Sequence, residues 1–165
     1  MRKCLFLFIL VGSLQSSYAQ SDSLKAPYLR FPTFPPVKLL LPDSTYFTKE
    51  SLDKKSNIML MLFSPQCEHC QHETEQLVRQ IDRFKKIEII MATFMPFDSM
   101  MAFREKYGLA KFKNITVAHD YQYFLPAFYN IHNLPYFAFY NRKKELISAF
   151  EGAIPLDKAL QELEK

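Results

Sequence analysis

A continuous apolar run of strand length follows Asn57 and ends at Phe63, and a second, mainly apolar stretch that contains Glu88 lies at residues 87–93. Because these stretches lack the alternation of a half-exposed strand, they predict strands buried on both faces of a sheet that helices cover. From Cys67 onward, apolar positions recur at steps of three and four residues, with Glu73 and Glu75 on the opposite face, which predicts an amphipathic helix. The side chains expected on its buried face are Thr74, Leu77, Val78, Ile81 and Phe84.

The end of the chain predicts a hairpin followed by a helix. Residues 136–140 and 145–150 have strand character and are joined by a polar turn, and Gly152 ends the second strand. Pro155 begins a helix whose apolar residues form a single stripe. This stripe consists of Leu156, Ala159, Leu160 and Leu163.

Weaker patterns fill the rest of the chain. Asp98 is expected to cap a helix over residues 101–107, which Gly108 ends. The order of the elements predicts an α/β fold with a mixed central sheet flanked by helices. Further strands are expected at residues 37–41, 46–48 and 115–118, a turn or loop at 50–55, and a helix at 121–129 despite Pro126.

The first residues have the composition of a secretory signal peptide. Arg2 and Lys3 precede an uncharged apolar run at residues 4–14, and small residues lead to Ala19, after which we place the cleavage. The run has 11 residues, whereas spanning a bilayer takes roughly 20, so cleavage is favoured over a retained membrane anchor. We therefore expect export to the periplasm or another extracytoplasmic compartment, with no membrane attachment after cleavage.

The expected organisation is a signal peptide at residues 1–19, a lead-in at 20–36 and one domain at 37–165. The lead-in is rich in proline, which lacks the backbone donor that a central strand needs, so we expect an extended segment. The remaining length suits one domain with its own core, and we expect a monomer. Although the formal net charge is +4, the basic residues form no stripe along which a phosphate backbone would bind, which argues against a nucleic-acid partner.

Loss of the signal peptide removes Cys4 and leaves Cys67 and Cys70 as the cysteines of the mature chain. A bond between them closes a very small loop and constrains the unfolded chain little, so redox chemistry explains the pair better than a structural disulfide does. Cys67 falls where a strand gives way to a helix, and the free amides and dipole of a helix N-terminus favour a thiolate. Cys70 follows one turn later on the same face, placed to attack the mixed disulfide that Cys67 forms.

The two residues between the cysteines are expected to tune the pair in opposite directions. A protonated His69 supports a thiolate on Cys67, which stabilises the dithiol form and makes the protein more oxidising. An ionised Glu68 disfavours the same thiolate and has the opposite effect.

Residues 63–70, with the sequence FSPQCEHC, resemble the thioredoxin superfamily, because they lie between a buried strand and an amphipathic helix. Residues 133–140 resemble the cis-proline loop of that family and the strand after it, and the similarity extends over residues 37–165. Together with the export signal and the lead-in, this makes the chain most similar to the exported TlpA/ResA-like branch.

The resemblance implies a thioredoxin-like fold and a thiol–disulfide oxidoreductase that needs no cofactor, with reduction of protein disulfides as the favoured direction. It implies a redox-active disulfide between Cys67 and Cys70. It also implies that Pro135 is cis and faces the cysteines, with the backbone of Leu134 pairing with an extended substrate and Tyr136 lining the groove. The implied partners are protein thiols or disulfides and a second redox partner that resets the pair.

Two positions depart from the pattern of the family. Gln66 stands where thioredoxin has tryptophan, and Met61 stands where the family often has a buried acid. The proton of Cys70 must then pass to water, to Glu68 or to another group.

Two other classes of function compete with the redox enzyme. In a thioredoxin-fold copper chaperone, Cys67 and Cys70 would bind the metal together with His69 or His72, because thiolate and imidazole ligands suit copper. The two histidines point to different faces of the predicted helix, and we expect no metal site. In a noncatalytic binding module, the cysteines would be dispensable for partner binding.

Overall fold

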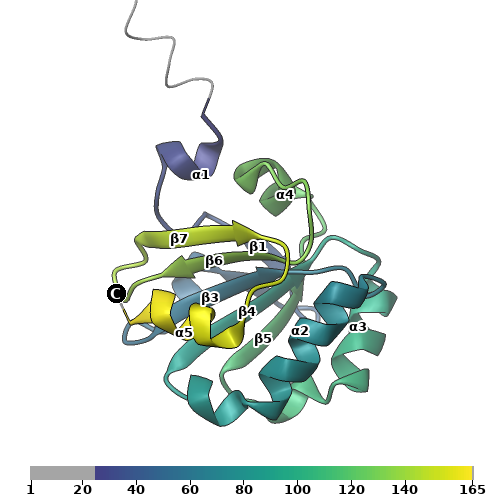
Figure 1. The fold of residues 1–165 in the computed structure, drawn as a ribbon. Helices are drawn as coiled ribbons and strands as arrows, with labels where there is room; N and C mark the ends of the chain where they lie inside the picture. The colour runs from purple at the N-terminus through teal and green to yellow at the C-terminus, as the bar shows by residue number, and fades with distance from the viewer. Residues whose placement is uncertain (1–24, 165) are drawn as a thin grey trace, which may run out of the picture.

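The computed structural model describes residues 25–164, so the expected signal peptide lies outside the described part of the chain. The chain forms a seven-stranded mixed sheet in the order β2-β1-β5-β4-β3-β6-β7, with helices on both faces (Figure 1). The predicted α/β architecture is thereby confirmed. The strands are β1 (Lys38–Leu40), β2 (Tyr46–Thr48), β3 (Asn57–Leu62), β4 (Ile87–Thr93), β5 (Ile115–His119), β6 (Tyr136–Tyr140) and β7 (Leu146–Glu151).

The described residues also form five α-helices and three short 3₁₀ turns. No helix within residues 25–164 is long and apolar enough to cross a membrane. The helices are α1 (Pro27–Arg30), α2 (Glu68–Arg79), α3 (Phe97–Lys106), α4 (Phe124–Tyr129) and α5 (Leu156–Leu163), and the 3₁₀ turns are Lys49–Ser51, Ile81–Phe84 and Leu109–Lys111.

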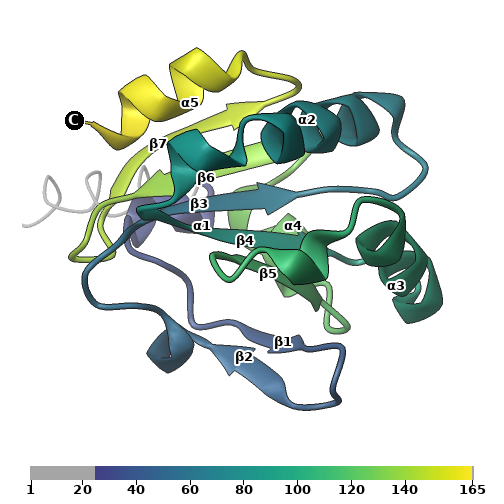
Figure 2. The same cartoon turned by 90° about the horizontal axis from the view of Figure 1, so that it is seen from below.

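The sheet separates two hydrophobic cores, which explains the uninterrupted apolar run of β3. Met59 and Met61 face the core that α2, α3 and α5 cover, whereas Leu60 and Leu62 face the core that α1 and α4 cover. Figure 2 shows these two groups of helices on opposite sides of the sheet. The prediction of a strand buried on both faces is therefore confirmed.

The parallel strands β3, β4 and β5 end at the same edge of the sheet. Hydrogen bonds continue past the strand ends, because the amide of Phe63 donates to the carbonyl of Ala92 at 3.0 Å and the amide of Asp120 to that of Thr93 at 2.8 Å. The three loops that follow these strands therefore begin side by side. They are residues 64–67, 94–96 and 120–123.

Two helices begin elsewhere than the sequence pattern predicts. Helix α3 starts at Phe97 with Pro96 as its N-cap, so Asp98 belongs to the first turn and is not the cap. Proline fits this position because the start of a helix does not use the N–H that proline lacks. Helix α4 starts at Phe124, later than predicted, because residues 121–123 form a turn before it.

The lead-in packs on the domain. Its residues Pro27–Arg30 form one helical turn, which corrects the expectation of a fully extended segment. Proline is favourable at the first helical position because its ring already holds the backbone in a helical conformation. Beyond this turn the chain is extended, Thr33 bridges to Glu145 of the β6–β7 hairpin, and Phe34 is buried in the core that α4 covers.

Candidate functional site

Cys67 lies at the junction of β3 and α2, as predicted. It is the N-cap residue of α2, and its amide donates to the carbonyl of Ser64 at 3.1 Å, which closes a tight turn after the strand. The Cys67 sulfur accepts a hydrogen bond of 3.2 Å from the backbone amide of Cys70. The sulfur thus takes the place of the oxygen of a capping Ser or Asp, at a helix end where an anion is stabilised.

A second contact joins the Cys67 sulfur to the loop before β6. The thiol donates to the carbonyl of Leu134 at a distance of 3.7 Å. The Leu134–Pro135 peptide bond is cis, as the resemblance implies, and the carbonyl of Pro135 accepts from the amide of Gly152 at 2.8 Å. The fold therefore brings together the two segments that carry the resemblance.

The two sulfurs differ in exposure. Cys67 is partly exposed, whereas Cys70 is 0% exposed. Burial, followed by the hydrogen bond with the Cys67 sulfur, raises the pKa of the Cys70 thiol well above its ordinary value. Both cysteines are free thiols in this structure, so it represents the dithiol form, and the disulfide between them stays a prediction. This asymmetry suits an outer sulfur that attacks and an inner sulfur that follows.

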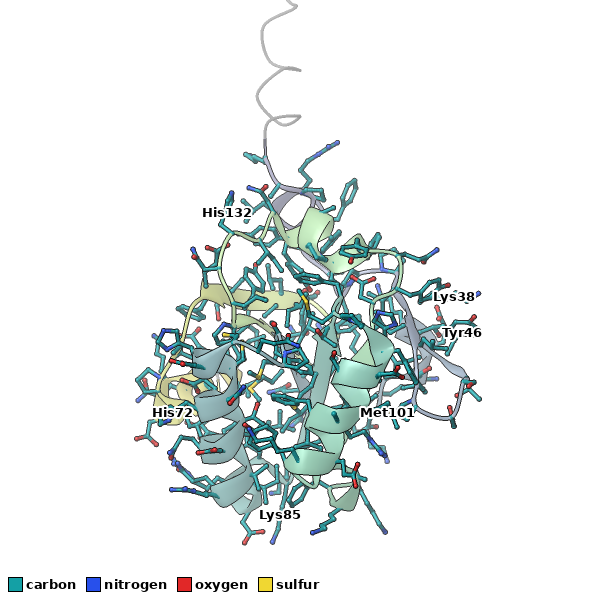
Figure 3. All side chains as sticks on the ribbon, turned by 90° about the vertical axis from the view of Figure 1, so that its right-hand side faces the viewer. Lys38, Tyr46, His72, Lys85, Met101 and His132 are labelled. Atoms are coloured by element: carbon teal, nitrogen blue, oxygen red, sulfur yellow. The ribbon has the colours of Figure 1, made fainter. Side chains whose placement is uncertain are left out.

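Glu68 and His69 lie in the first turn of α2 with exposed side chains. The Cys67 sulfur forms its described hydrogen bonds with Cys70 and with the carbonyl of Leu134 and with neither of these residues, so their tuning roles stay predictions. His72 projects from α2 on the side away from α3 (Figure 3). Among residues 25–164, no three His, Cys, Asp or Glu side chains are grouped so that they could hold a metal ion together.

Glu73 is a residue near the cysteines whose burial the hydrophobic pattern misses. The pattern predicts an exposed position, whereas the side chain is only 7% exposed. Burial raises the pKa of its carboxyl, and this effect exceeds the opposite effect of nearby His72. Glu73 borders a polar pocket of about 260 Å³ together with Ile154. The spacing of Glu73 from Cys70 indicates this burial, because residues three apart lie on the same face of a helix and Cys70 faces the core.

Tyr136, expected beside the substrate groove, has a mainly structural environment. Its side chain is 3% exposed and its ring lies 5.0 Å from that of Tyr129, whose hydroxyl bonds to that of Tyr140. Burial raises the pKa of Tyr136, so the phenol stays neutral. It also contributes to the wall of a surface pocket of about 400 Å³ with Tyr28 and Glu151. Its role in substrate binding stays a prediction.

Several solved structures share this arrangement of strands and helices. A secreted disulfide oxidoreductase of Mycobacterium tuberculosis, homologous to DsbE of E. coli, is 20% identical, with a TM-score of 0.65 over 78% of this chain and 95% of that one. DsbF of Mycobacterium tuberculosis is 18% identical, with a TM-score of 0.66 over 78% and 93%. An exposed lipoprotein thioredoxin of Streptococcus pneumoniae is 18% identical, with a TM-score of 0.59 over 78% and 97%. At these identities the similarity shows the fold.

The family is shown by the sequence itself. No curated protein matches the chain significantly. The family model of the thioredoxin-like domain matches residues 48–165, which is most of the chain and includes both cysteines and the cis-proline loop. The chain therefore belongs to the thioredoxin-like domain family, within the thioredoxin superfamily.

Proposed function

We propose that this protein is an exported, TlpA/ResA-like thiol–disulfide oxidoreductase that reduces protein disulfides with Cys67 and Cys70. The observation that carries the proposal is the hydrogen bond from the Cys70 amide to the Cys67 sulfur, with the Cys70 thiol buried behind it. This arrangement supports a thiolate on the outer cysteine and keeps the inner cysteine protonated until it reacts. It favours a nucleophile and a resolving thiol over two equivalent metal ligands.

The reaction consists of two thiol–disulfide exchanges. The Cys67 thiolate attacks one sulfur of a substrate disulfide, which forms a mixed disulfide and releases the other substrate sulfur to take up a proton. Cys70 then loses its proton and attacks the Cys67 sulfur, which releases the second substrate thiol. Two electrons pass from the dithiol to the substrate, and a disulfide between Cys67 and Cys70 remains. A separate redox partner must reduce this disulfide before the next cycle.

The second exchange needs an acceptor for the proton of Cys70, since burial raises the pKa of this thiol. Glu73 lies one turn after Cys70 on the buried side of α2. Burial raises the pKa of the Glu73 carboxyl, so this carboxyl binds a proton more readily than an exposed one does. We assign this acceptor role to Glu73, with the polar pocket beside it as the route to solvent.

The substrate segment is proposed to bind along the loop before β6. The Leu134 carbonyl contacts the Cys67 sulfur, so a chain attached to that sulfur by a disulfide lies beside the backbone of Leu134. Extended substrates add to exposed backbone in this way by main-chain hydrogen bonds. The substrates are therefore protein segments rather than small thiols alone, and we propose that a monomer binds them.

We propose the reductase direction because the hydrogen bond that supports the Cys67 thiolate comes from a neutral backbone amide and not from a charged side chain. Stabilising a thiolate favours the dithiol form and makes a pair more oxidising. Here that donor is the amide of Cys70, which lies 3.2 Å from the Cys67 sulfur. The similar structures include a disulfide oxidoreductase and a thioredoxin, which supports the class of reaction.

Reduction of insulin in the presence of dithiothreitol tests this function. The protein should accelerate the reaction, Cys67→Ser should abolish the acceleration, and Cys70→Ser should accumulate a mixed disulfide through Cys67 that a reductant removes. Glu75→Gln, a change at an exposed position of α2, should retain turnover and serves as the matched control. Full turnover by Cys67→Ser would refute the mechanism, and no acceleration by the unchanged protein would favour the noncatalytic binding module.

Export is the second part of the proposal. The basic start, the short apolar run at residues 4–14 and the small residues before Ala19 support it. Two similar structures are described as secreted or exposed proteins. N-terminal sequencing of the full chain after expression in a bacterial host should find Gln20 as the first residue in the periplasmic fraction. A cytoplasmic protein that begins at Met1 would contradict export.

A further inference from the structure

Tyr123 has an uncommon backbone conformation for a large residue. Its φ is +54° and its ψ is 30°, in the left-handed region that favours glycine. Its side chain is nevertheless 62% exposed, so core packing does not explain why a tyrosine stands there. Such a conformation costs free energy in a bulky residue and persists only where the surrounding structure fixes it.

Asp120 is the residue that fixes this turn. Its buried carboxylate accepts hydrogen bonds from the amides of Phe124 at 3.1 Å and Leu125 at 2.7 Å, and its backbone carbonyl accepts from the amide of Tyr123 at 3.2 Å. The amide of Asp120 is itself bonded to Thr93 at the end of β4. The turn is thus attached rigidly to the sheet and holds the Tyr123 ring outside it.

The Tyr123 ring is paired with that of Phe94. The two ring centroids lie 5.6 Å apart with an interplanar angle of 41°. Phe94 directly follows β4 and is only half-buried. We call these two rings the Phe94–Tyr123 pair.

This pair lies on the same sheet edge as the reactive sulfur. Cys67 follows β3, Phe94 follows β4 and Tyr123 follows β5, and these strands are neighbours that end together. Adjacent strands are about 4.8 Å apart, so the ends of β4 and β5, which carry Phe94 and Tyr123, lie about 5 and 10 Å from the end of β3, a span that an extended chain covers in about three residues. A substrate joined to Cys67 by a disulfide therefore passes over the pair if it extends toward β5.

Apart from the buried Asp120, the three loops along this edge carry no charged side chain, and the exposed Glu68 lies beyond them in the first turn of α2. The residues after β3 are Ser-Pro-Gln, those after β4 are Phe-Met-Pro, and those after the buried Asp120 are Tyr-Gln-Tyr. A charged substrate side chain would lose water there without gaining a partner, whereas an apolar one would bury surface. The edge thus matches a neutral, apolar segment.

We propose that the Phe94–Tyr123 pair binds a large apolar side chain carried about three residues from the cysteine of a disulfide substrate. This inference rests on the proposed function, because the disulfide at Cys67 is what holds the substrate over the pair. The pair makes the protein selective for unfolded or flexible segments with exposed apolar residues. Tyr123 and Phe94 act on the choice of substrate and take no part in the exchange of electrons.

Two synthetic peptides test this selectivity. Each carries one cysteine linked by a disulfide to thionitrobenzoate, and they differ in having phenylalanine or serine three residues away. The dithiol protein attacks the peptide sulfur and releases thionitrobenzoate, and Cys70 then releases the peptide thiol, so two electrons leave the protein and both substrate sulfurs are reduced. The release of the coloured thiol gives the rate constant for each peptide.

The unchanged protein should react about fivefold faster with the phenylalanine peptide, as expected for one aromatic contact. Tyr123→Gly should lower this ratio to about one, in keeping with loss of that contact. Glycine suits the positive φ, so the variant should keep or raise its melting temperature, and Tyr123→Asn, which also tolerates this conformation, provides a second variant. Tyr121→Ser is the matched control, because Tyr121 is an exposed ring of the same turn that packs on Tyr46 and not on Phe94.

The outcomes separate this inference from the proposed function. Equal rates for the two peptides would overturn the proposed role of the Phe94–Tyr123 pair while disulfide exchange itself persists. An unchanged ratio of the two rates in Tyr123→Gly and Tyr123→Asn would overturn it as well. A fall of the ratio in Tyr121→Ser as large as in Tyr123→Gly would also overturn it, since the effect would not be specific to the pair. If the unchanged protein released thionitrobenzoate from neither peptide, both the proposed function and the proposed role of the Phe94–Tyr123 pair would be wrong.

Discussion

The backbone amide of Cys70 donates a hydrogen bond of 3.2 Å to the sulfur of Cys67. One residue therefore supplies both the donor that supports the attacking sulfur and the thiol that later displaces it. The helix imposes this relationship, because an N-cap residue accepts from the amide two or three positions further on. A spacing of two residues between the cysteines is thus what the first turn of α2 requires.

The two thiols should react with iodoacetamide at very different rates. Cys67 is partly exposed at a helix N-terminus, whereas burial raises the pKa of Cys70 and closes it to the reagent. At neutral pH we expect alkylation of Cys67 to be at least about tenfold faster, since the thiolate is the reactive form. Mass spectrometry of the digested protein measures both rates, and a sample labelled in denaturant, where the two should react alike, is the control. Equal labelling of the native protein would contradict the burial of Cys70.

Replacing Glu73 with glutamine should stabilise the protein at neutral pH. Burial raises the pKa of the Glu73 carboxyl, so its ionised form is penalised in the folded state. This penalty is absent below the unfolded-state pKa of about 4.3 and grows as the pH rises through the folded-state pKa. The melting temperature of Glu73→Gln should therefore exceed that of the unchanged protein at pH 7, and the two should converge near pH 4. Glu75→Gln, an exposed position of the same helix, should show no such convergence.

Phe34→Ala should destabilise the domain although the residue lies in the lead-in. The Phe34 ring is buried and lies 5.2 Å from the ring of Tyr140 in an edge-on arrangement. Removing a buried phenylalanine costs about 3–5 kcal/mol. Phe31→Ala, at a position that is 59% exposed, is the matched control, with an expected change below about 0.5 kcal/mol. Chemical denaturation measures both, and equal effects would show that the lead-in does not belong to the folded unit.

Asp120→Ala should cost about 2 kcal/mol of stability, because it removes the acceptor of two amides at the start of α4. Asp120→Asn keeps one oxygen and should lose about half as much free energy. Asp98→Ala, at an exposed position in the first turn of α3, should change the stability by about 0.5 kcal/mol or less. Urea titrations of the three variants give these differences, and an effect of Asp98→Ala as large as that of Asp120→Ala would contradict the capping role.

The sequence predicts most elements of this fold, because their signals are local. The buried strands β3 and β4, the hairpin of β6 and β7, and α5 lie where periodicity predicts them. The pairing of β1 with β5 through Leu40 and His119 is not predictable in the same way, because the hydrophobic pattern of a strand does not determine which other strand it pairs with. The starts of α3 and α4 also differ from the prediction. Pro96 sets the start of α3, and the Asp120 carboxylate, which accepts hydrogen bonds from two backbone amides, sets the start of α4.

The candidate site is likewise predictable from the sequence only in part. The positions of Cys67 and Cys70 follow from the strand-to-helix transition, and the contact with Leu134 agrees with the resemblance. The burial of Glu73 is missed, because a charged residue was assigned to the solvent face although its spacing from Cys70 places it on the inner one. The Phe94–Tyr123 pair is missed because its rings meet only once β4 and β5 are aligned.

The bridge between Thr33 and Glu145 has a consequence for the behaviour of the protein in concentrated solution. Strand β7 is an edge strand of the sheet. The unpaired backbone of an edge strand can pair with a strand of another chain, which leads to aggregation. The lead-in covers the start of this edge strand, because the amide of Leu146 donates to the carbonyl of Pro32 and the amide of Phe34 donates to the carbonyl of Lys144. Pro32 and Pro35, which flank the paired residues of the lead-in, have no backbone N–H. The outer side of the lead-in therefore cannot form a regular hydrogen-bond ladder with a further strand. The lead-in thus protects the start of β7 against pairing with a further chain.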